Sequence, residues 1–178
     1  MGHTAPRGGT CLTVSALVFT PEAEPRVLLH QHKRYPVVIP PGGHVEPAEH
    51  PWQAVLRELG EEAGVVPKQL SALLPLEFAA GPGRFPAPVA LDVHEVEPGW
   101  THTDLAFVFV IDGAPLLAPG EGESEELCWL TAAEVGRRPR VPPRIAELVG
   151  RLAPLVAVWP RLPAAEVGMA ARALSQSG

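Results

Sequence analysis

Residues 51 to 63 constrain the fold more than any other stretch, because their side chains predict an amphipathic helix. At about 100° per residue, the apolar side chains fall on one stripe and three carboxylates fall together on another arc. Glu58 lies three residues before Glu61 and four before Glu62, so these three side chains are neighbours on the helix surface. The stripe that we expect to face the core consists of Trp52, Val55, Leu56, Leu59 and Ala63.

Three like charges on one face of a helix repel one another, by roughly a few tenths of a kcal/mol for each adjacent pair. Arg57, four residues before Glu61, offsets only part of this repulsion. A hard divalent cation would neutralise the cluster, and Mg²⁺ usually takes one or two protein carboxylates beside water and phosphate. A solvated acidic helix face explains the same residues without a ligand, so both interpretations stay open.

A glycine loop precedes the helix. Pro40-Pro41-Gly42-Gly43 is first stiff and then permissive, and a backbone without Cβ atoms lets a ligand approach closely. Loop and helix together resemble the Nudix box, whose pattern is G-x5-E-x7-R-E-U-x-E-E-x-G-U with U an aliphatic residue. The chain meets every specified position, and so many fixed positions at fixed spacing make the motif specific. They are Gly43, Glu49, Arg57, Glu58, Leu59, Glu61, Glu62, Gly64 and Val65.

The resemblance implies an α/β fold, the Nudix-type α/β/α sandwich around a mixed β-sheet. It also implies an enzyme that hydrolyses a pyrophosphate linkage in a nucleoside diphosphate linked to a moiety X. Such a nucleotide-like substrate is a nucleoside triphosphate, a nucleotide sugar or a dinucleoside polyphosphate. The implied cofactor is Mg²⁺, or Mn²⁺ in its place. By resemblance, the metal ligands are Glu58, Glu62 and the backbone carbonyl of Gly43, with Glu61 as a further candidate, and Arg57 orients these carboxylates.

A second carboxylate is needed as general base, because a cation lowers the pKa of any glutamate that ligates it. In the Nudix family this base often lies outside the box, in a loop before a late strand. The other dense carboxylate cluster of the chain ends the loop 115–124 and consists of Glu121, Glu123, Glu125 and Glu126. Glu126 is the first candidate, with Glu123 and Glu125 behind it. An ordinary solvated acidic loop is the alternative.

The remaining elements follow from β-branched and aromatic runs and from turn residues. We expect strands at 10–20, 26–32, 37–39, 70–79, 89–96, 102–111 and 127–130. Pro75 breaks the strand 70–79 or confines it to an edge of the sheet. A short helix begins at Thr131 with Glu134 in a capping-box position. Further helices are expected at 142–152 and 163–174.

Two groups of polar residues outside the box are candidates for substrate binding. Lys33 and Arg34 are an adjacent basic pair that clamps phosphate or belongs to a solvated loop. His102 and Asp104 lie two apart, so they share one face of the strand 102–111. His94 meets them across the hairpin if the strands 89–96 and 102–111 pair. A substrate site, a second metal site and a solvated strand end all remain open for this group.

The composition predicts one globular domain over residues 1–178, with flexible ends at 1–9 and 175–178. The 22 prolines are spread through turns, which favours rigid loops over disorder. A formal net charge of −6 without a basic stripe makes a nucleic-acid partner unlikely, an RNA-end hydrolase included. No run approaches 18 apolar residues, so we expect a cytoplasmic protein without membrane contact, and a homodimer stays open. Cys11 and Cys128 lie in apolar runs and predict buried thiols rather than a disulfide.

Two other functions use the same fold. An isoprenoid-diphosphate isomerase would need a catalytic cysteine, and Cys11 and Cys128 lie in apolar strands that favour an inert thiol. A non-catalytic nucleotide-sensing module usually lacks box glutamates, whereas all of them are present here. Neither Pro82 nor Tyr35 stands where a mark of a particular Nudix branch would place it, so the sequence leaves the substrate open.

Overall fold

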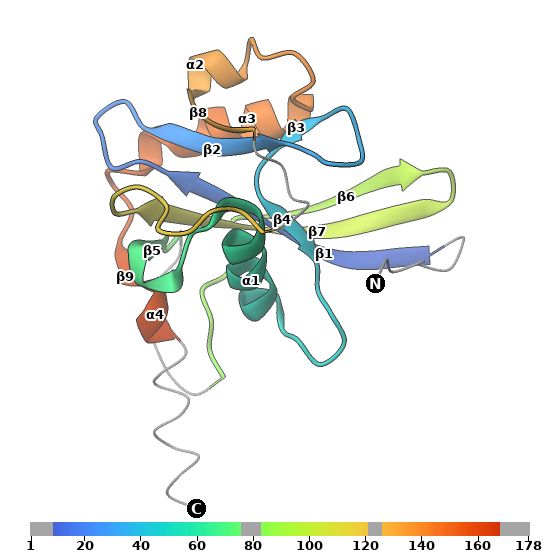
Figure 1. Cartoon of the computed structure of the whole chain (residues 1–178), viewed down its shortest axis with the longest axis horizontal. Coiled ribbons are helices and arrows are strands. Elements are labelled where there is room, and N and C mark those ends of the chain that lie inside the picture. Colours follow the sequence, from blue (N-terminus) through green and yellow to red (C-terminus); the bar gives the residue numbers. More distant parts are fainter. Residues whose placement is uncertain (1–8, 76–82, 121–125, 168–178) are drawn as a thin grey trace, which may run out of the picture.

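A computed structural model of the chain describes residues 9–75, 83–120 and 126–167. Its centre is one mixed β-sheet (Figure 1) with the strand order β3-β2-β1-β7-β5-β9, in which β4 also pairs with β1, β6 with β7 and β8 with β2. The strands are β1 (Gly9–Phe19), β2 (Arg26–Gln31), β3 (Val38–Ile39), β4 (Gly42–His44), β5 (Leu70–Leu73), β6 (Ala90–Glu97), β7 (Trp100–Ile111), β8 (Leu127–Thr131) and β9 (Arg161–Pro163). The helices are α1 (Pro51–Ala63), α2 (Ala132–Val135), α3 (Pro143–Leu152) and α4 (Ala164–Val167), with single 3-10 turns at Pro67–Gln69 and Ala153–Leu155.

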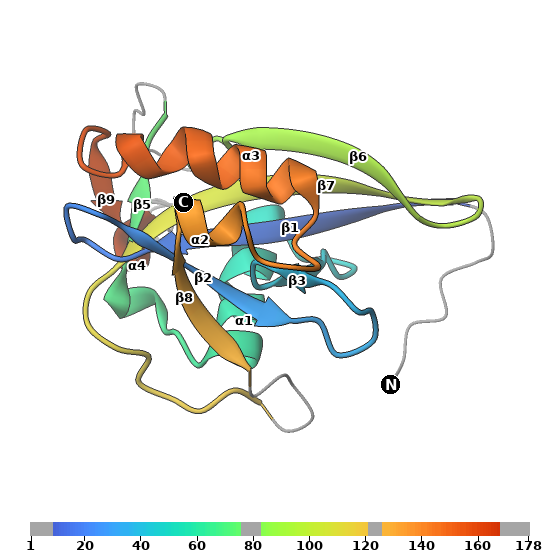
Figure 2. The same cartoon turned by 90° about the horizontal axis from the view of Figure 1, so that it is seen from above.

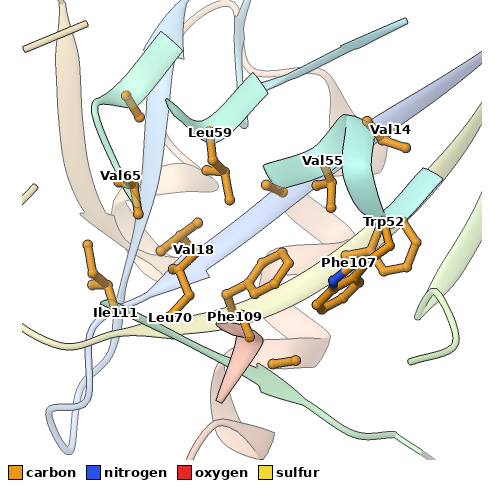
Figure 3. Close-up of a cluster of buried hydrophobic side chains, with 14 of the residues drawn as sticks. Val14, Val18, Trp52, Val55, Leu59, Val65, Leu70, Phe107, Phe109 and Ile111 are labelled. Atoms are coloured by element: carbon orange, nitrogen blue, oxygen red, sulfur yellow. The ribbon is translucent and has the colours of Figure 1, made fainter. Parts of the chain in front are cut away.

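Helices cover both faces of this sheet, with α1 on one face and α3 on the other (Figure 2). Successive side chains of β7 point to opposite faces and therefore enter two separate cores. Phe107 and Phe109 pack with α1 in the cluster of Figure 3, whereas Val108 and Val110 pack on the α3 side. This is the α/β/α sandwich around a mixed sheet that the sequence predicts, so the fold class is confirmed.

The pairing of β1 with β7 is parallel and runs through the middle of the sheet, and β6 forms an antiparallel hairpin with β7. The hairpin and the first half of β1 extend beyond the rest of the sheet (Figure 1). The register places His94 opposite His102 and Asp92 opposite Asp104, which confirms that His94 meets His102 across this hairpin.

The ends of α1 explain why the box helix occupies residues 51 to 63. His50 accepts a hydrogen bond from the backbone N–H of Gln53, and the Gln53 side chain accepts one from the backbone N–H of His50. This reciprocal capping, with Pro51 in the first turn, fixes the start of the helix. Gly64 ends it with φ of 64°, a left-handed conformation that glycine adopts without strain.

The predicted core stripe is largely confirmed, because Trp52, Val55, Leu59 and Ala63 are buried and Leu56 is half-buried. Among the described residues, no helix is both long and apolar enough to span a membrane. Both cysteines are free thiols, but they are half-buried rather than fully buried.

Most predicted strands are confirmed to within two residues, but the strand predicted at 70–79 is shorter. The strand that begins at Leu70 ends at Leu73, before Pro75, and residues 76–79 lie outside the described part of the chain. The strands β6 and β7 are joined by the turn Pro98-Gly99, in which Gly99 adopts φ of 78°. The helix predicted at 163–174 is found at Ala164–Val167, while Pro163 belongs to β9 and residues 168–174 lie outside the described part of the chain. The short strands β4 and β9 have no predicted counterpart, because two or three residues give no periodicity.

Candidate active site

Arg57 is the centre of a carboxylate network on α1. Its Nε and Nη2 atoms lie 3.0 Å from the two oxygens of Glu49, and Nη2 also donates to the backbone carbonyl of His44 at 3.0 Å. Nη1 lies 2.7 Å from Glu58 and 3.0 Å from Glu61. The hydrogen bond from Arg57 lowers the pKa of Glu49. Arg57 therefore ties the loop before the helix to two of the box carboxylates.

The carboxylate of Glu58 lies against the glycine loop, in a position that a side chain on Gly43 would block. Gly43 pairs with Val14 of β1, whose side chain belongs to the α1 side of the sheet. A Cβ atom on Gly43 would overlap the carboxylate group of Glu58. The missing side chain thus allows the Glu58 carboxylate to lie close to the backbone at Gly43, a close approach that glycine permits.

Glu62 differs from the other two glutamates in its surroundings. The side chain of Glu61 is 54% exposed, whereas Glu62 is 5% exposed as a residue and lies in the interior. Its Oε2 atom accepts a hydrogen bond of 2.8 Å from the backbone N–H of Gly42 and lies 3.4 Å from Nε2 of His30. The view of three equivalent surface neighbours is therefore wrong for Glu62, because β2 and β4 cover it.

The donor set on this face suits a hard divalent cation. It consists of carboxylates and backbone carbonyls, the ligands that Mg²⁺ and Mn²⁺ prefer. The described residues contain no group of three or more His, Cys, Asp and Glu side chains already arranged around a common metal position. Mg²⁺ does not require such a group, since it keeps several waters and takes few protein ligands. Because Gly43 has no Cβ atom, the Glu58 carboxylate lies against the backbone of the glycine loop, which is compatible with this mode of binding.

The other face of the sheet carries a groove of about 210 Å³ between α3 and the β6–β7 hairpin. Asp92 and Asp104 face each other across the hairpin, and Asp104 accepts a hydrogen bond of 2.8 Å from Thr13. Arg144 of α3 lies 2.7 Å from Asp92 and 3.0 Å from His94. Pro40 also lines the groove, so this groove extends to the glycine loop.

Imidazole rings gather next to the groove, where His94 contacts the groove residues Asp92 and Arg144. The ring of His102 lies 5.0 Å from His44, 5.7 Å from His94 and 5.5 Å from Trp100, measured between centroids. Burial, with a smaller contribution from His44, lowers the pKa of His102 from 6.5 to about 4. Burial and Arg144 also lower the pKa of His94. Both rings are therefore neutral near pH 7.

The basic pair Lys33 and Arg34 lies in the exposed loop between β2 and β3. Arg34 contacts Glu97 at 3.4 Å, and the Tyr35 hydroxyl donates to the same carboxylate at 2.8 Å. These contacts connect the loop with the tip of the β6–β7 hairpin. A role of Lys33 and Arg34 as a phosphate clamp stays a prediction.

Glu126 is exposed and immediately precedes β8, while Glu121, Glu123 and Glu125 lie outside the described residues. The first residue of β8, Leu127, pairs with His30 of β2. His30 in turn contacts Glu62. Glu126, which directly precedes Leu127, is therefore next in sequence to a residue that pairs with the neighbour of a box carboxylate. Its role as general base stays a prediction.

Comparisons with known proteins agree with this geometry. The family model of the NUDIX domain matches residues 9–152. The chain belongs to the Nudix family. Its fold is similar to that of a NUDIX hydrolase from Clostridium perfringens, with a TM-score of 0.68, 24% identity, and coverage of 85% of this chain and 99% of that chain. An Ap4A hydrolase of C. elegans gives a TM-score of 0.64 at 21% identity, covering 83% of this chain and 98% of that chain.

A curated relative of this Nudix chain is diphosphoinositol polyphosphate phosphohydrolase 2 of Rattus norvegicus, which is 47% identical over 64 residues. The match covers 35% of this chain and 36% of the relative. The chain thus spans about a third of the length of the curated relatives that it matches. Nudix hydrolases generally need a divalent metal, which agrees with the donor set around Glu58 and Glu62.

Sequence analysis does not predict His30 or His44 as residues of the Nudix site, and it does not predict the contact that Gly42 makes with Glu62. Gly42 and His30 contact Glu62, and His44 both accepts a hydrogen bond from Arg57 and packs against His102. Gly42 and His44 are the sequence neighbours of Gly43, the first box glycine, so their place in the sequence could have predicted that they belong to the site. His30 lies in an apolar strand far from the box in sequence, and only the fold shows its contact.

Proposed function

We propose that this Nudix protein is a divalent-metal-dependent pyrophosphohydrolase that cleaves a pyrophosphate linkage in a nucleoside diphosphate linked to a moiety X. The observation that carries the proposal is the arrangement of Gly43, Glu58 and Arg57. Gly43 leaves room for the Glu58 carboxylate against the backbone of the loop, and Arg57 holds that carboxylate at 2.7 Å. A merely solvated acidic face needs neither the missing Cβ atom nor a guanidinium that also binds the preceding loop.

Glu58 and Glu62 would hold the cation, with Glu61 and the carbonyl of Gly43 as further ligands. When bound, the ion neutralises phosphate charge and acidifies a coordinated water. Arg57 acts on Glu49, Glu58 and Glu61 and orients them, so it does not need to touch substrate. Glu126 would accept the proton of the attacking water.

The groove on the α3 side would bind the moiety X. Pro40 brings the groove up to the glycine loop, which allows one substrate to contact both. Neutral rings of His94 and His102 favour stacking with a planar group, and Asp104 offers a carboxylate that accepts N–H donors. These properties favour a nucleobase as the occupant of the groove.

A polyphosphorylated occupant fits this groove less well. Asp92 and Asp104 repel further negative charge, and both arginines that line the groove are already paired, Arg144 with Asp92 at 2.7 Å and Arg151 with Glu147 at 3.0 Å. The curated relatives are named for a diphosphoinositol polyphosphate. That substrate class is therefore the alternative to test beside the nucleotides, with Lys33 and Arg34 as candidate phosphate contacts.

An isoprenoid-diphosphate isomerase is less well supported. The pKa of Cys128 is raised by burial, which disfavours a reactive thiolate, and Cys11 lies 3.2 Å from the indole N–H of Trp100 on β7. A non-catalytic module is also less well supported, since every box glutamate is retained.

A substrate panel with Mg²⁺ and with Mn²⁺ tests the proposal. Nucleoside triphosphates, nucleotide sugars, dinucleoside polyphosphates and a diphosphoinositol polyphosphate are compared by phosphate release after addition of a pyrophosphatase. Glu58→Gln and Glu62→Gln should each lower turnover by about a hundredfold or more while the protein stays folded. Full activity in excess chelator would refute metal-dependent hydrolysis.

A further inference from the structure

Two buried polar side chains meet behind the box helix. His30 is 1% exposed and Glu62 is 5% exposed, and His30 Nε2 lies 3.4 Å from Glu62 Oε2. Histidine and glutamate are seldom fully buried unless they have a specific partner. The pair joins a box carboxylate to a strand that is distant in sequence.

The position of His30 is set by the pairing of β2 with β3 and β8. Its residue pairs with Ile39 of β3 on one side and with Leu127 of β8 on the other. Leu28, two residues earlier on β2, packs in the cluster on the α1 side. Since residues two apart share a face of a strand, His30 points toward α1 and holds its imidazole beside Glu62.

Burial of a carboxylate is unfavourable unless donors replace the lost water. For Glu62, the backbone N–H of Gly42 at 2.8 Å supplies one such donor, and Nε2 of His30 approaches the same oxygen. Arg57 performs the equivalent task for Glu58 on the outer side of α1. The two candidate metal carboxylates are therefore oriented by different side chains.

We propose that His30 is a positioning residue that orients Glu62 for binding of the divalent cation. This inference rests on the proposed function, because it assigns His30 to the same metal site. Side chains that orient metal-ligating carboxylates commonly contribute about tenfold to a hundredfold in metal affinity. His30 need not touch substrate to have this effect.

The test uses Mn²⁺ binding to the substrate-free protein, measured by electron paramagnetic resonance of the free ion. His30→Gln and His30→Asn are matched variants, because the Gln amide nitrogen replaces Nε2 whereas the Asn amide nitrogen replaces Nδ1. Leu28→Ala is the control for lost packing, since Leu28 is buried on the same strand and face. Urea titration establishes that each variant is folded under the conditions used.

We expect His30→Asn to weaken Mn²⁺ binding by about tenfold or more and His30→Gln to stay within about threefold of the wild type. Leu28→Ala should bind Mn²⁺ like the wild type although it is less stable. Binding by His30→Asn within about threefold of the wild type would overturn the role of His30, as would an equal loss in Leu28→Ala. A wild-type protein that does not bind Mn²⁺ would overturn the inference and the proposed function together.

Discussion

Nη1 of Arg57 lies 2.7 Å from Oε1 of Glu58, its neighbour in sequence. Adjacent residues on a helix do not face each other, so both long side chains must bend toward a common position. The segment before α1 explains this arrangement, because Glu49 and the carbonyl of His44 accept hydrogen bonds from the guanidinium of Arg57 and hold it in place. Arg57 thus offsets more of the carboxylate repulsion than its i,i+4 spacing to Glu61 alone predicts.

The substitution Arg57→Lys should keep the charge but lose this arrangement, because an ammonium group cannot replace a planar fork. We expect the free energy of unfolding to fall by about 1–3 kcal/mol, the range for hydrogen bonds to charged groups. The kcat should fall by about tenfold or more. The control is Arg26→Lys, whose ion pair with Glu134 is about half exposed and should contribute less than about 1 kcal/mol. Wild-type turnover in Arg57→Lys would contradict the orienting role of Arg57.

Gly43→Ala should separate the glycine loop from the carboxylate that faces it. The added methyl group overlaps Glu58, so either the loop or the carboxylate must move. We expect turnover and Mn²⁺ affinity to fall by about tenfold or more. Gly150→Ala is the matched control, since a Cβ atom there contacts nothing within 4 Å, and alanine within a helix should stabilise α3 slightly. Equal activity of the two variants would show that the close approach of the Glu58 carboxylate to Gly43 has no function.

Short-range patterns in the sequence predict the helix face and most of the strands, whereas the sandwich follows from the resemblance to the Nudix family. The stripe from Trp52 to Ala63 predicts the burial of Leu59, because a helical period of 3.6 residues needs no distant information. The same period places Glu58, Glu61 and Glu62 on one arc and cannot distinguish them. What separates Glu62 from Glu61 is cover by β2 and β4, and that depends on pairings between distant strands.

The groove residues, too, can be predicted from the sequence only where they follow from local strand geometry. Alternation along a strand predicts that His102 and Asp104 share a face, and the hairpin register brings His94 and Asp92 opposite them. The contribution of Arg144 depends on how α3 crosses the sheet. His44 joins the cluster only because β4 pairs with β1, and a strand of three residues leaves no readable period.

Leu59→Ala tests the core under the box helix. Leu59 is 0% exposed and packs in the cluster on the α1 side, so its truncation leaves a cavity. We expect a loss of about 2–5 kcal/mol in the free energy of unfolding, measured by urea titration. Val158→Ala, at a side chain that is 73% exposed, should change it by less than about 0.5 kcal/mol. A similarly small loss for Leu59→Ala would place this face outside the core.

His102 should make the protein less stable as the pH falls from 6.5 to about 4. Its pKa is about 4 in the folded chain and 6.5 ordinarily, so the unfolded chain binds more protons within this window. The contribution of neutral His102 to the free energy of unfolding is therefore complete above pH 6.5 and is lost as the pH falls toward 4. The charged and titratable groups that face it are His32, His44, His94 and Arg144.

Urea titrations of wild type and His102→Gln at pH 7.0, 5.5 and 4.5 test this prediction, because the difference between them isolates His102 from the carboxylates. The variant should lose less stability than the wild type over this range. Parallel curves for the two proteins would mean that His102 titrates alike in the folded and unfolded chains.

Glu126 is expected to act as general base from outside the box. A base must reach the attacking water within about 3 Å or through one further water. Leu127, the first residue of β8, pairs with His30, and His30 contacts Glu62. The start of β8 therefore lies on the side of the molecule that carries the box carboxylates. The loop before it is anchored near the same helix, because the backbone N–H of Gly120 donates to the carbonyl of Glu61 at 2.6 Å.

Glu126→Gln should therefore lower kcat by about a hundredfold, leave KM within about threefold, and leave Mn²⁺ affinity unchanged. The amide retains the size of the side chain and loses its capacity to accept a proton. Glu24→Gln is the control, since Glu24 is exposed in the turn at the opposite end of β2. Glu123→Gln and Glu125→Gln are measured alongside, because both remain candidates for the same role. Turnover within about threefold of the wild type for all three variants would return proton abstraction to the box glutamates or to a metal-bound hydroxide.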